Sequence, residues 1–380
     1  MRNFIFLGFA CSEEEFENSQ KYQKVNFRQT YNFSHALLAF IRSKGYKVIN
    51  DSYVPGQHSW KNFINRNCND EHSNIYSSFL FLKEILIVFN VTKNIFRFKP
   101  TSIFVHGLYV PFLLPCALMK VFFKYSLTIV LTDKVNLSSK KPINLFLRKL
   151  NQSLIFFLLK SFQSSISLSR GLSDIYLPNK PSLIVPGFIP SELLSKNEYN
   201  QSIMDEKRKI NITYSGALEQ SYGILDFYKA FKLSSNNEIV LNVCGSGALN
   251  AFFLEESKVN DHLSYYGFLD REELDSLYKK TDVFINPRKI DNELVFFSSP
   301  SKIFEYLCFN KPVYTTNLPT IEDPFSKLFY FFNGDTVSDY VEFLDSLDKH
   351  LLSKLLQHST HNTKKANNLY NRLTIEHLIK

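Results

Sequence analysis

The chain has 380 residues, of which 44% are hydrophobic and 21% are charged. At roughly 100–200 residues per domain this length favours two domains, and the composition is ordinary for a globular protein. These values exclude a disordered chain, a collagen-like fibre and a disulfide-rich miniprotein. The five cysteines form no Cys-x-x-Cys pair, which argues against a zinc site and fits a reducing compartment.

The formal net charge of +8 is unevenly distributed. Residues 1–190 carry 23 Lys and Arg against 10 Asp and Glu, whereas residues 191–380 carry 21 against 26. A strongly basic half suits an anionic membrane surface, a nucleic acid or a phosphorylated substrate. Since no nucleic-acid recognition motif accompanies the basic residues, we expect no nucleic-acid partner.

Two apolar stretches have some features of targeting or membrane segments. Residues 4–10 precede Cys11 as in a lipoprotein signal, but acidic residues follow at once, so we expect a first buried strand. Residues 102–119 lack a formal charge, as a membrane span would. Because Gly107 and two prolines interrupt this stretch, we expect a strand, a loop and a helix there.

Strand and helix patterns alternate along both halves, which predicts parallel α/β sheets. In the first half we expect strands over 4–7, 47–49, 103–105, 126–131, 165–168 and 183–185, and helices over 31–44, 76–98, 111–123 and 143–159. In the second half we expect strands over 211–214, 239–243, 263–266, 283–285 and 313–315, and helices from 224 and over 248–256, 272–279, 301–308 and 337–380.

These patterns predict two Rossmann-like domains, over residues 1–190 and 191–355. The polar stretch 190–208 serves as the linker, and a C-terminal helix over 356–380 can pack back on the first domain. Two such domains leave a central cleft between the carboxyl edges of their sheets. Ligands of open α/β sheets bind at that edge, so we expect the site on loops that follow strands.

The densest candidate-site pattern begins after the strand over 283–285. Following a loop, Pro300-Ser301-Lys302 opens a helix, and Glu305 lies one turn further on the same face. The first turn of a helix, the Ser301 hydroxyl and the Lys302 ammonium together suit a diphosphate. Because the Glu305 carboxylate can accept two hydrogen bonds from a ribose diol, the pattern indicates a nucleotide-diphosphate site. The alternative is a capped surface helix with a Lys–Glu pair.

Three glycine motifs each follow a predicted strand of the second half. Glycine lets the backbone approach a ligand closely, although each motif is weak by itself. The motifs are Ser215-Gly216 with Gly223, Cys244-Gly245-Ser246-Gly247, and Tyr266-Gly267-Phe268-Leu269.

Taken in order with Asn286-Pro287-Arg288 and the helix at Ser301, these motifs resemble the donor-binding domain of retaining family-4 glycosyltransferases of the GT-B fold. The resemblance extends from Ser215 to Val313. The first half resembles the acceptor domain of that family more loosely. Its best match is Ile129–Asp133, which is similar to the strand-Thr-Asp of the branch that builds polysaccharides.

The resemblance implies roles for the residues that bind the donor. Glu305 would bind the ribose. Ser301 and Lys302 would bind the diphosphate, with Arg288 nearby. The leaving-group charge would be met by Lys302, Arg288 and the helix dipole.

Four further roles follow from the resemblance. Gly216 would lie under the diphosphate or the sugar, and Phe268 would frame the base through its backbone. Asp133 and His106, at the ends of two neighbouring strands, are the catalytic candidates. Asp133 would orient the sugar or the acceptor, or stabilise oxocarbenium-like charge; the alternative for Asp133 is a loop cap.

The sequence departs from the family pattern at three positions. Phe297 stands where the family often has the first of two glutamates eight residues apart, and Glu293 lies four residues earlier. Ala217 and Tyr222 replace an arginine and a lysine that often bind phosphate. No Asp-x-Asp occurs in the chain, which argues against the metal-dependent glycosyltransferase fold, so we expect no metal and no cofactor besides the donor.

The function expected from these observations is retaining transfer of a hexose from a nucleotide-diphosphate sugar. The acceptor would be a surface polysaccharide such as lipopolysaccharide O-antigen or capsule, growing on a polyprenyl diphosphate. We expect a cytoplasmic protein, peripheral at the inner face of the plasma membrane, with basic residues at 120, 124, 148, 149 and 160 serving the acceptor. The alternatives are a nucleotide-sugar epimerase of the same fold and a degenerate, non-catalytic transferase domain.

Overall fold

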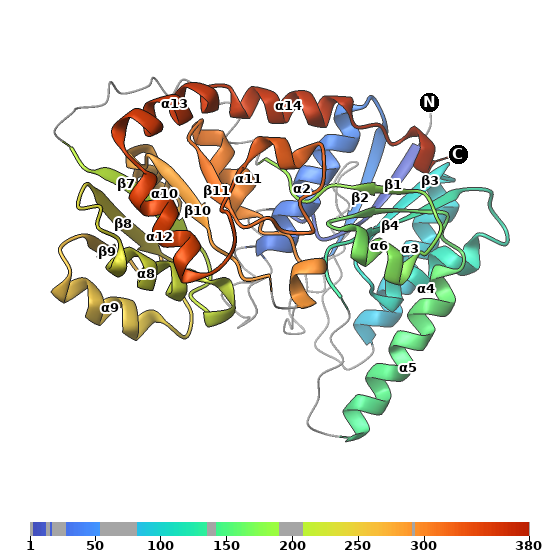
Figure 1. Ribbon diagram of the computed structural model, residues 1–380. Helices are drawn as coiled ribbons and strands as arrows, with labels where there is room; N and C mark the ends of the chain where they lie inside the picture. Colours follow the sequence, from blue (N-terminus) through green and yellow to red (C-terminus); the bar gives the residue numbers. More distant parts are fainter. Residues whose placement is uncertain are drawn as a thin grey trace. The chain divides into compact units, whose positions relative to one another are not determined.

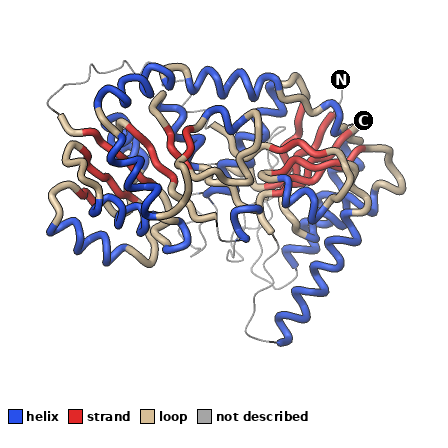
Figure 2. Tube along the Cα trace, viewed as in Figure 1, coloured by secondary structure: helices blue, strands red, loops and turns tan. Residues whose placement is uncertain are grey.

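The computed structural model describes residues 3–12, 16, 28–53, 82–134, 142–189, 208–290 and 293–379. The chain divides into two compact units. The first unit is Met1–Val185 together with Leu373–Lys380, and the second is Pro186–Arg372. Each has its own six-stranded parallel sheet with helices around it (Figures 1 and 2). The predicted pair of Rossmann-like α/β domains is confirmed.

The sheet of the first unit has the strand order β2-β1-β3-β4-β5-β6. Its strands are β1 (Asn3–Gly8), β2 (Lys47–Ser52), β3 (Ser102–His106), β4 (Ser126–Leu131), β5 (Ser164–Ser167) and β6 (Ser182–Ile184). Its helices are α2 (Arg28–Ser43), α3 (Leu82–Phe98), α4 (Val110–Met119), α5 (Pro142–Leu159) and α6 (Arg170–Tyr176). All five residues of β3 are buried, as expected for a parallel strand with both faces covered.

The sheet of the second unit has the strand order β12-β11-β10-β7-β8-β9. Its strands are β7 (Ile210–Ser215), β8 (Ile239–Cys244), β9 (Leu263–Tyr265), β10 (Val283–Asn286), β11 (Val313–Thr315) and β12 (Tyr330–Phe331). Its helices are α8 (Ile224–Leu233), α9 (Asn250–Val259), α10 (Arg271–Lys280), α11 (Lys302–Tyr306), α12 (Val337–Ser346), α13 (Lys349–Ser359) and α14 (Asn362–Arg372).

The apolar stretch at 102–119 forms β3, a loop and α4, as predicted. Of the helix expected over 76–98, residues 76–81 lie outside the described residues, and α3 accounts for the rest. Within the described parts of the chain, no helix is long and apolar enough to cross a membrane.

The C-terminal segment differs from the single helix expected over 356–380. Helix α13 ends at Ser359, α14 ends at Arg372, and the last residues belong to the first unit. There Ile375 and Leu378 are buried, and the Leu378 carbonyl accepts hydrogen bonds from Ser164 Oγ at 2.8 Å and Thr128 Oγ1 at 3.5 Å. Burial of these apolar side chains and bonding of this carbonyl favour an irregular tail over a continued helix.

The order of strands reverses beside β7, which lies between β8 and β10. At this topological switch point the loop after β7 meets the loops after β8 and β10. Gly245 has φ +136°, and a Cβ there would lie 1.8 Å from the Gly216 carbonyl oxygen. Gly223 has φ +76°, and a Cβ there would lie 1.7 Å from the Pro287 carbonyl oxygen. Only glycine permits these contacts, so the motif glycines are needed to join the loops.

We expect Gly245→Ala to destabilise the second unit strongly. The added methyl group would clash with the Gly216 carbonyl, and a backbone group cannot move aside as a flexible side chain can. The cost should be at least about 2 kcal/mol of unfolding free energy. The matched control is Gly267→Ala, where φ is +64° but no atom lies within 4 Å of the added Cβ. That substitution should cost only about 1 kcal/mol of backbone strain. Equal losses in denaturant unfolding would contradict the packing argument.

Candidate functional site

Glu305 lies on α11, where it is buried and bound by two cations. Its Oε2 accepts a hydrogen bond from Lys302 Nζ at 2.8 Å, and its Oε1 accepts one from Arg271 Nη1. Burial acts to raise the pKa of Glu305, but Lys302 and Arg271 outweigh it and hold the pKa below its ordinary value. The carboxylate is therefore a fixed, ionised acceptor.

Arg271 is a residue of this cluster that the sequence reading missed. It is the first residue of α10, whose start is fixed by a capping box between Asp270 and Glu273. Its guanidinium also lies 3.1 Å from Asp275 Oδ1. Glu305 and Asp275 outweigh burial and raise the pKa of Arg271. Arg271 lies two residues after the Tyr266-Gly267-Phe268-Leu269 motif. This closeness to a candidate-site motif is the sequence signal that could have identified it.

Tyr306 connects α11 to the glycine loops. Its hydroxyl donates to the Ser215 carbonyl and accepts from the Ser215 N–H, both at 2.9 Å. Its ring stacks on Phe284 of β10, with centroids 4.3 Å apart. Since Ser215 precedes Gly216, the structure places Glu305 and Gly216 at the same edge of the sheet, as the sequence predicted.

Arg288 follows β10 and is buried. Its guanidinium lies 5.0 Å from the centre of the Tyr222 ring, and its Nη1 donates to the Ser298 carbonyl at 3.3 Å. Burial lowers its pKa. Tyr222, which replaces the expected lysine, thus holds Arg288 by a cation–π contact next to the Gly223 turn.

Ser301 and Phe268 have fewer contacts. Ser301 is the exposed N-cap residue of α11, and its side chain makes no capping hydrogen bond. The helix expected over 301–308 is shorter: α11 ends at Tyr306 and a 3-10 turn follows over Leu307–Phe309. Asn310, in left-handed conformation, ends that turn. Phe268 is 78% exposed.

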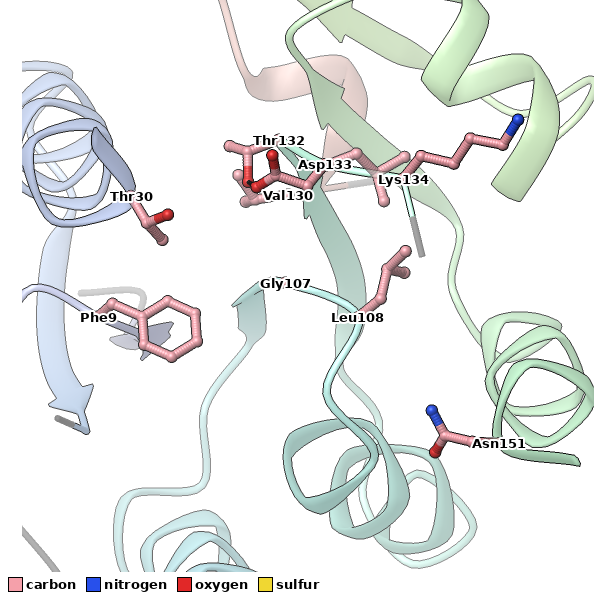
Figure 3. Close-up of a pocket in the computed structure, with 10 residues that line it drawn as sticks. Phe9, Thr30, Gly107, Leu108, Val130, Thr132, Asp133, Lys134 and Asn151 are labelled. Carbon is pink, nitrogen blue, oxygen red and sulfur yellow. Dashed lines mark hydrogen bonds between the residues drawn. The ribbon is translucent and has the colours of Figure 1, made fainter. Parts of the chain in front are cut away.

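A pocket of about 380 Å³ lies at the carboxyl edge of the first unit's sheet. Figure 3 shows its lining, which comes from the ends of β1, β3 and β4 and from α2 and α5. Asp133 is exposed in it, and its Oδ2 accepts a hydrogen bond from Thr132 Oγ1 at 2.9 Å, whereas Lys134 extends away. Thr30 and Asn151 also line this pocket and were not predicted.

His106 is the second catalytic candidate, but it is fully buried and does not line the pocket. Its Nε2 lies 3.2 Å from Thr132 Oγ1, and its Nδ1 lies 2.6 Å from Ser34 Oγ. Because Thr132 donates its only proton to Asp133, it accepts from Nε2–H, and Nδ1 accepts from Ser34. His106 therefore positions Thr132, and through it Asp133, instead of contacting a ligand.

Burial lowers the pKa of His106 to about 3, so the folded protein holds this imidazole neutral. The unfolded chain takes up a proton below about pH 6.5, so the stability contributed by neutral His106 is complete above that pH and decreases towards pH 3. Between about pH 7 and about pH 5.5, the wild-type protein should lose roughly 1 kcal/mol more unfolding free energy than His106→Gln.

The control for this comparison is His358→Gln, because the His358 imidazole is exposed on α13. Its stability should follow the wild-type pH profile in urea unfolding. A His106→Gln profile parallel to that of the wild type would show that the buried imidazole is not the source of the acid sensitivity.

Residues 195–365 match the family model of glycosyl transferases group 1. The matched residues lie within the second unit. No curated protein sequence matches the chain significantly.

Several solved structures have a similar fold at low sequence identity. The apo lipopolysaccharide outer core galactosyltransferase WaaB has 12% identity, with 98% of this chain and 100% of that chain covered and a TM-score of 0.55. HepE from Anabaena in complex with UDP has 11% identity, 97% and 96% coverage, and a TM-score of 0.57. A glycosyltransferase from Rickettsia africae has 11% identity, 97% and 98% coverage, and a TM-score of 0.57. The predicted GT-B fold is confirmed.

Proposed function

We propose that the protein is a retaining glycosyltransferase that moves a hexose from a nucleotide-diphosphate sugar to a growing, lipid-linked surface polysaccharide such as O-antigen or capsule. The observation that carries the proposal is the ionised Glu305 between Lys302 and Arg271, at the edge of a sheet in a group 1 domain. Stereochemical retention follows the family resemblance of the motifs.

The donor nucleotide would bind at the carboxyl edge of the second unit. Glu305 accepts hydrogen bonds from the ribose diol, and its two cationic partners keep it oriented and ionised. The Lys302 side chain is 39% exposed, so its ammonium can also reach a phosphate. Gly216 and Gly245 present backbone without side chains, which allows close approach of the diphosphate.

Transfer breaks the bond between the anomeric carbon and the diphosphate oxygen. Negative charge then appears on the leaving diphosphate, while the acceptor hydroxyl forms the new bond and loses its proton. Lys302 and Arg288 would stabilise the leaving charge. We therefore propose a reaction that needs neither a metal nor another cofactor.

The sugar acceptor would bind in the pocket around Asp133, which belongs to the first unit. Its carboxylate is exposed and held by Thr132, so it can accept a hydrogen bond from an acceptor hydroxyl. HepE was solved with UDP, and WaaB is a galactosyltransferase of lipopolysaccharide outer core. Both support a nucleotide-sugar donor and a glycan acceptor for this chain.

The first test of the donor site is Glu305→Ala. Loss of charge-assisted hydrogen bonds to the ribose should weaken nucleotide binding by roughly 1.5–3 kcal/mol. Thermal shifts with UDP, GDP, ADP, CMP and TDP first identify the base, because a ligand at 100 times its dissociation constant stabilises by about 2.7 kcal/mol. Titration calorimetry of wild type and variant then measures the loss.

Glu255→Ala removes an exposed carboxylate of the same unit and should leave nucleotide affinity unchanged. Unchanged affinity in Glu305→Ala would remove the ribose assignment. If none of the five nucleotides binds to the wild type, the degenerate-domain alternative is favoured.

Asp133→Asn should lower turnover by roughly 100-fold or more while donor affinity stays within twofold. The reason is that Asp133 acts on the acceptor, in a different unit from the Glu305 cluster. The assay measures sugar transfer and, separately, release of free sugar without an acceptor. Sugar isomerisation or release at full rate without any acceptor would favour the epimerase alternative.

A further inference from the structure

Helix α5 exposes an apolar stripe that no described part of the first unit covers. Six of its side chains are large, apolar and exposed: Ile143, Phe146, Leu147, Leu150, Leu154 and Phe157. Their spacing of three, one, three, four and three residues places them on one face of the helix. The helix buries a different side through Ile155, Leu158 and Leu159. The exposed stripe is thus additional to the face that joins α5 to the core.

Further exposed apolar side chains lie on α3 and just after α4. Helix α3 packs on α4, and α4 packs on α5. Phe89 and Phe96 of α3 are exposed, as are Val121 and Phe122 just after α4. Figure 1 shows one end of α5 extending beyond the sheet of the first unit, so the stripe lies on a projecting element. Exposed apolar area of this extent on a globular unit marks an interaction surface.

The charge around this surface distinguishes its possible partners. Segments 82–134 and 142–160 contain ten Lys and Arg against two Asp and Glu. Arg148 and Lys149 lie within the exposed part of α5. Two copies of such a surface would repel each other, whereas a bilayer with anionic lipids attracts it. An apolar stripe flanked by basic side chains is typical of a helix that lies in the membrane interface.

We propose that the first unit binds an anionic bilayer through α3, α4 and α5, with the α5 stripe in the boundary between headgroups and acyl chains. Asn151 of α5 lines the Asp133 pocket and directly follows Leu150 of the stripe. Docking therefore brings the pocket to the bilayer, where a lipid-linked acceptor is held. That last link rests on the proposed function, whereas the docking itself does not.

The test is co-sedimentation of the full chain with vesicles. Phosphatidylcholine vesicles containing about one third phosphatidylglycerol should bind the protein, and pure phosphatidylcholine vesicles should bind it at least about tenfold more weakly. Phe146→Asn with Leu150→Asn, at positions 62% and 57% exposed, should lower the affinity by about tenfold or more. Arg148→Gln with Lys149→Gln should lower it by about fivefold per charge.

The matched control is Leu254→Asn with Val259→Asn, which changes two apolar side chains of α9 that are 50% and 82% exposed. It should bind vesicles like the wild type. All variants should keep their melting temperature and their affinity for the nucleotide, so a failed donor site and a failed membrane surface give different results.

Three outcomes would overturn the proposal. They are no binding to anionic vesicles, equal loss of binding in the α9 control, or a dimer in light scattering that Phe146→Asn with Leu150→Asn dissociates. The last would assign the surface to a second copy of the chain.

Discussion

The second unit depends on direct contact between backbone segments at the carboxyl edge of its sheet. β7 and β8 run in register up to Ser215 and Cys244, and the loops beyond them stay joined through Gly216 N–H to Cys244 O at 3.1 Å. Gly245 lies against the Gly216 carbonyl, so a side chain cannot be placed between these loops. The same restriction leaves the backbone at Gly216 and Gly245 partly exposed, at the edge where we propose that the donor diphosphate binds.

The fold could be predicted from the sequence because apolar runs and glycine turns alternate clearly in both halves. Seven of the twelve strands in the described residues have five residues or fewer, but most of them carry buried apolar side chains, which give a clear sequence pattern.

 The elements that escaped prediction are β12, with two residues, and α6, with seven. Such short segments contain less than two full periods of an apolar pattern, so only their tertiary neighbours define them.

The candidate site could be predicted where its partners are close in sequence. Lys302 and Glu305 are one helical turn apart, and the structure pairs them. Arg271 escaped because it is 34 residues from Glu305, and only the folded sheet brings the two together. The burial of His106 also depends on packing: Phe6, Phe9 and Phe33 surround its ring. Its imidazole contacts Ser34 and Thr132 and does not line the pocket.

The first unit is discontinuous in sequence, since Leu373–Lys380 returns to it after the whole second unit. The Leu378 carbonyl accepts hydrogen bonds from hydroxyls of β4 and β5, so these last residues are part of that unit's own structure. In evolution, exchange of the second unit between related chains would then need two recombination points, near residues 185 and 372. A single crossover would combine a tail from one lineage with strands from another, and only tails compatible with both would survive selection.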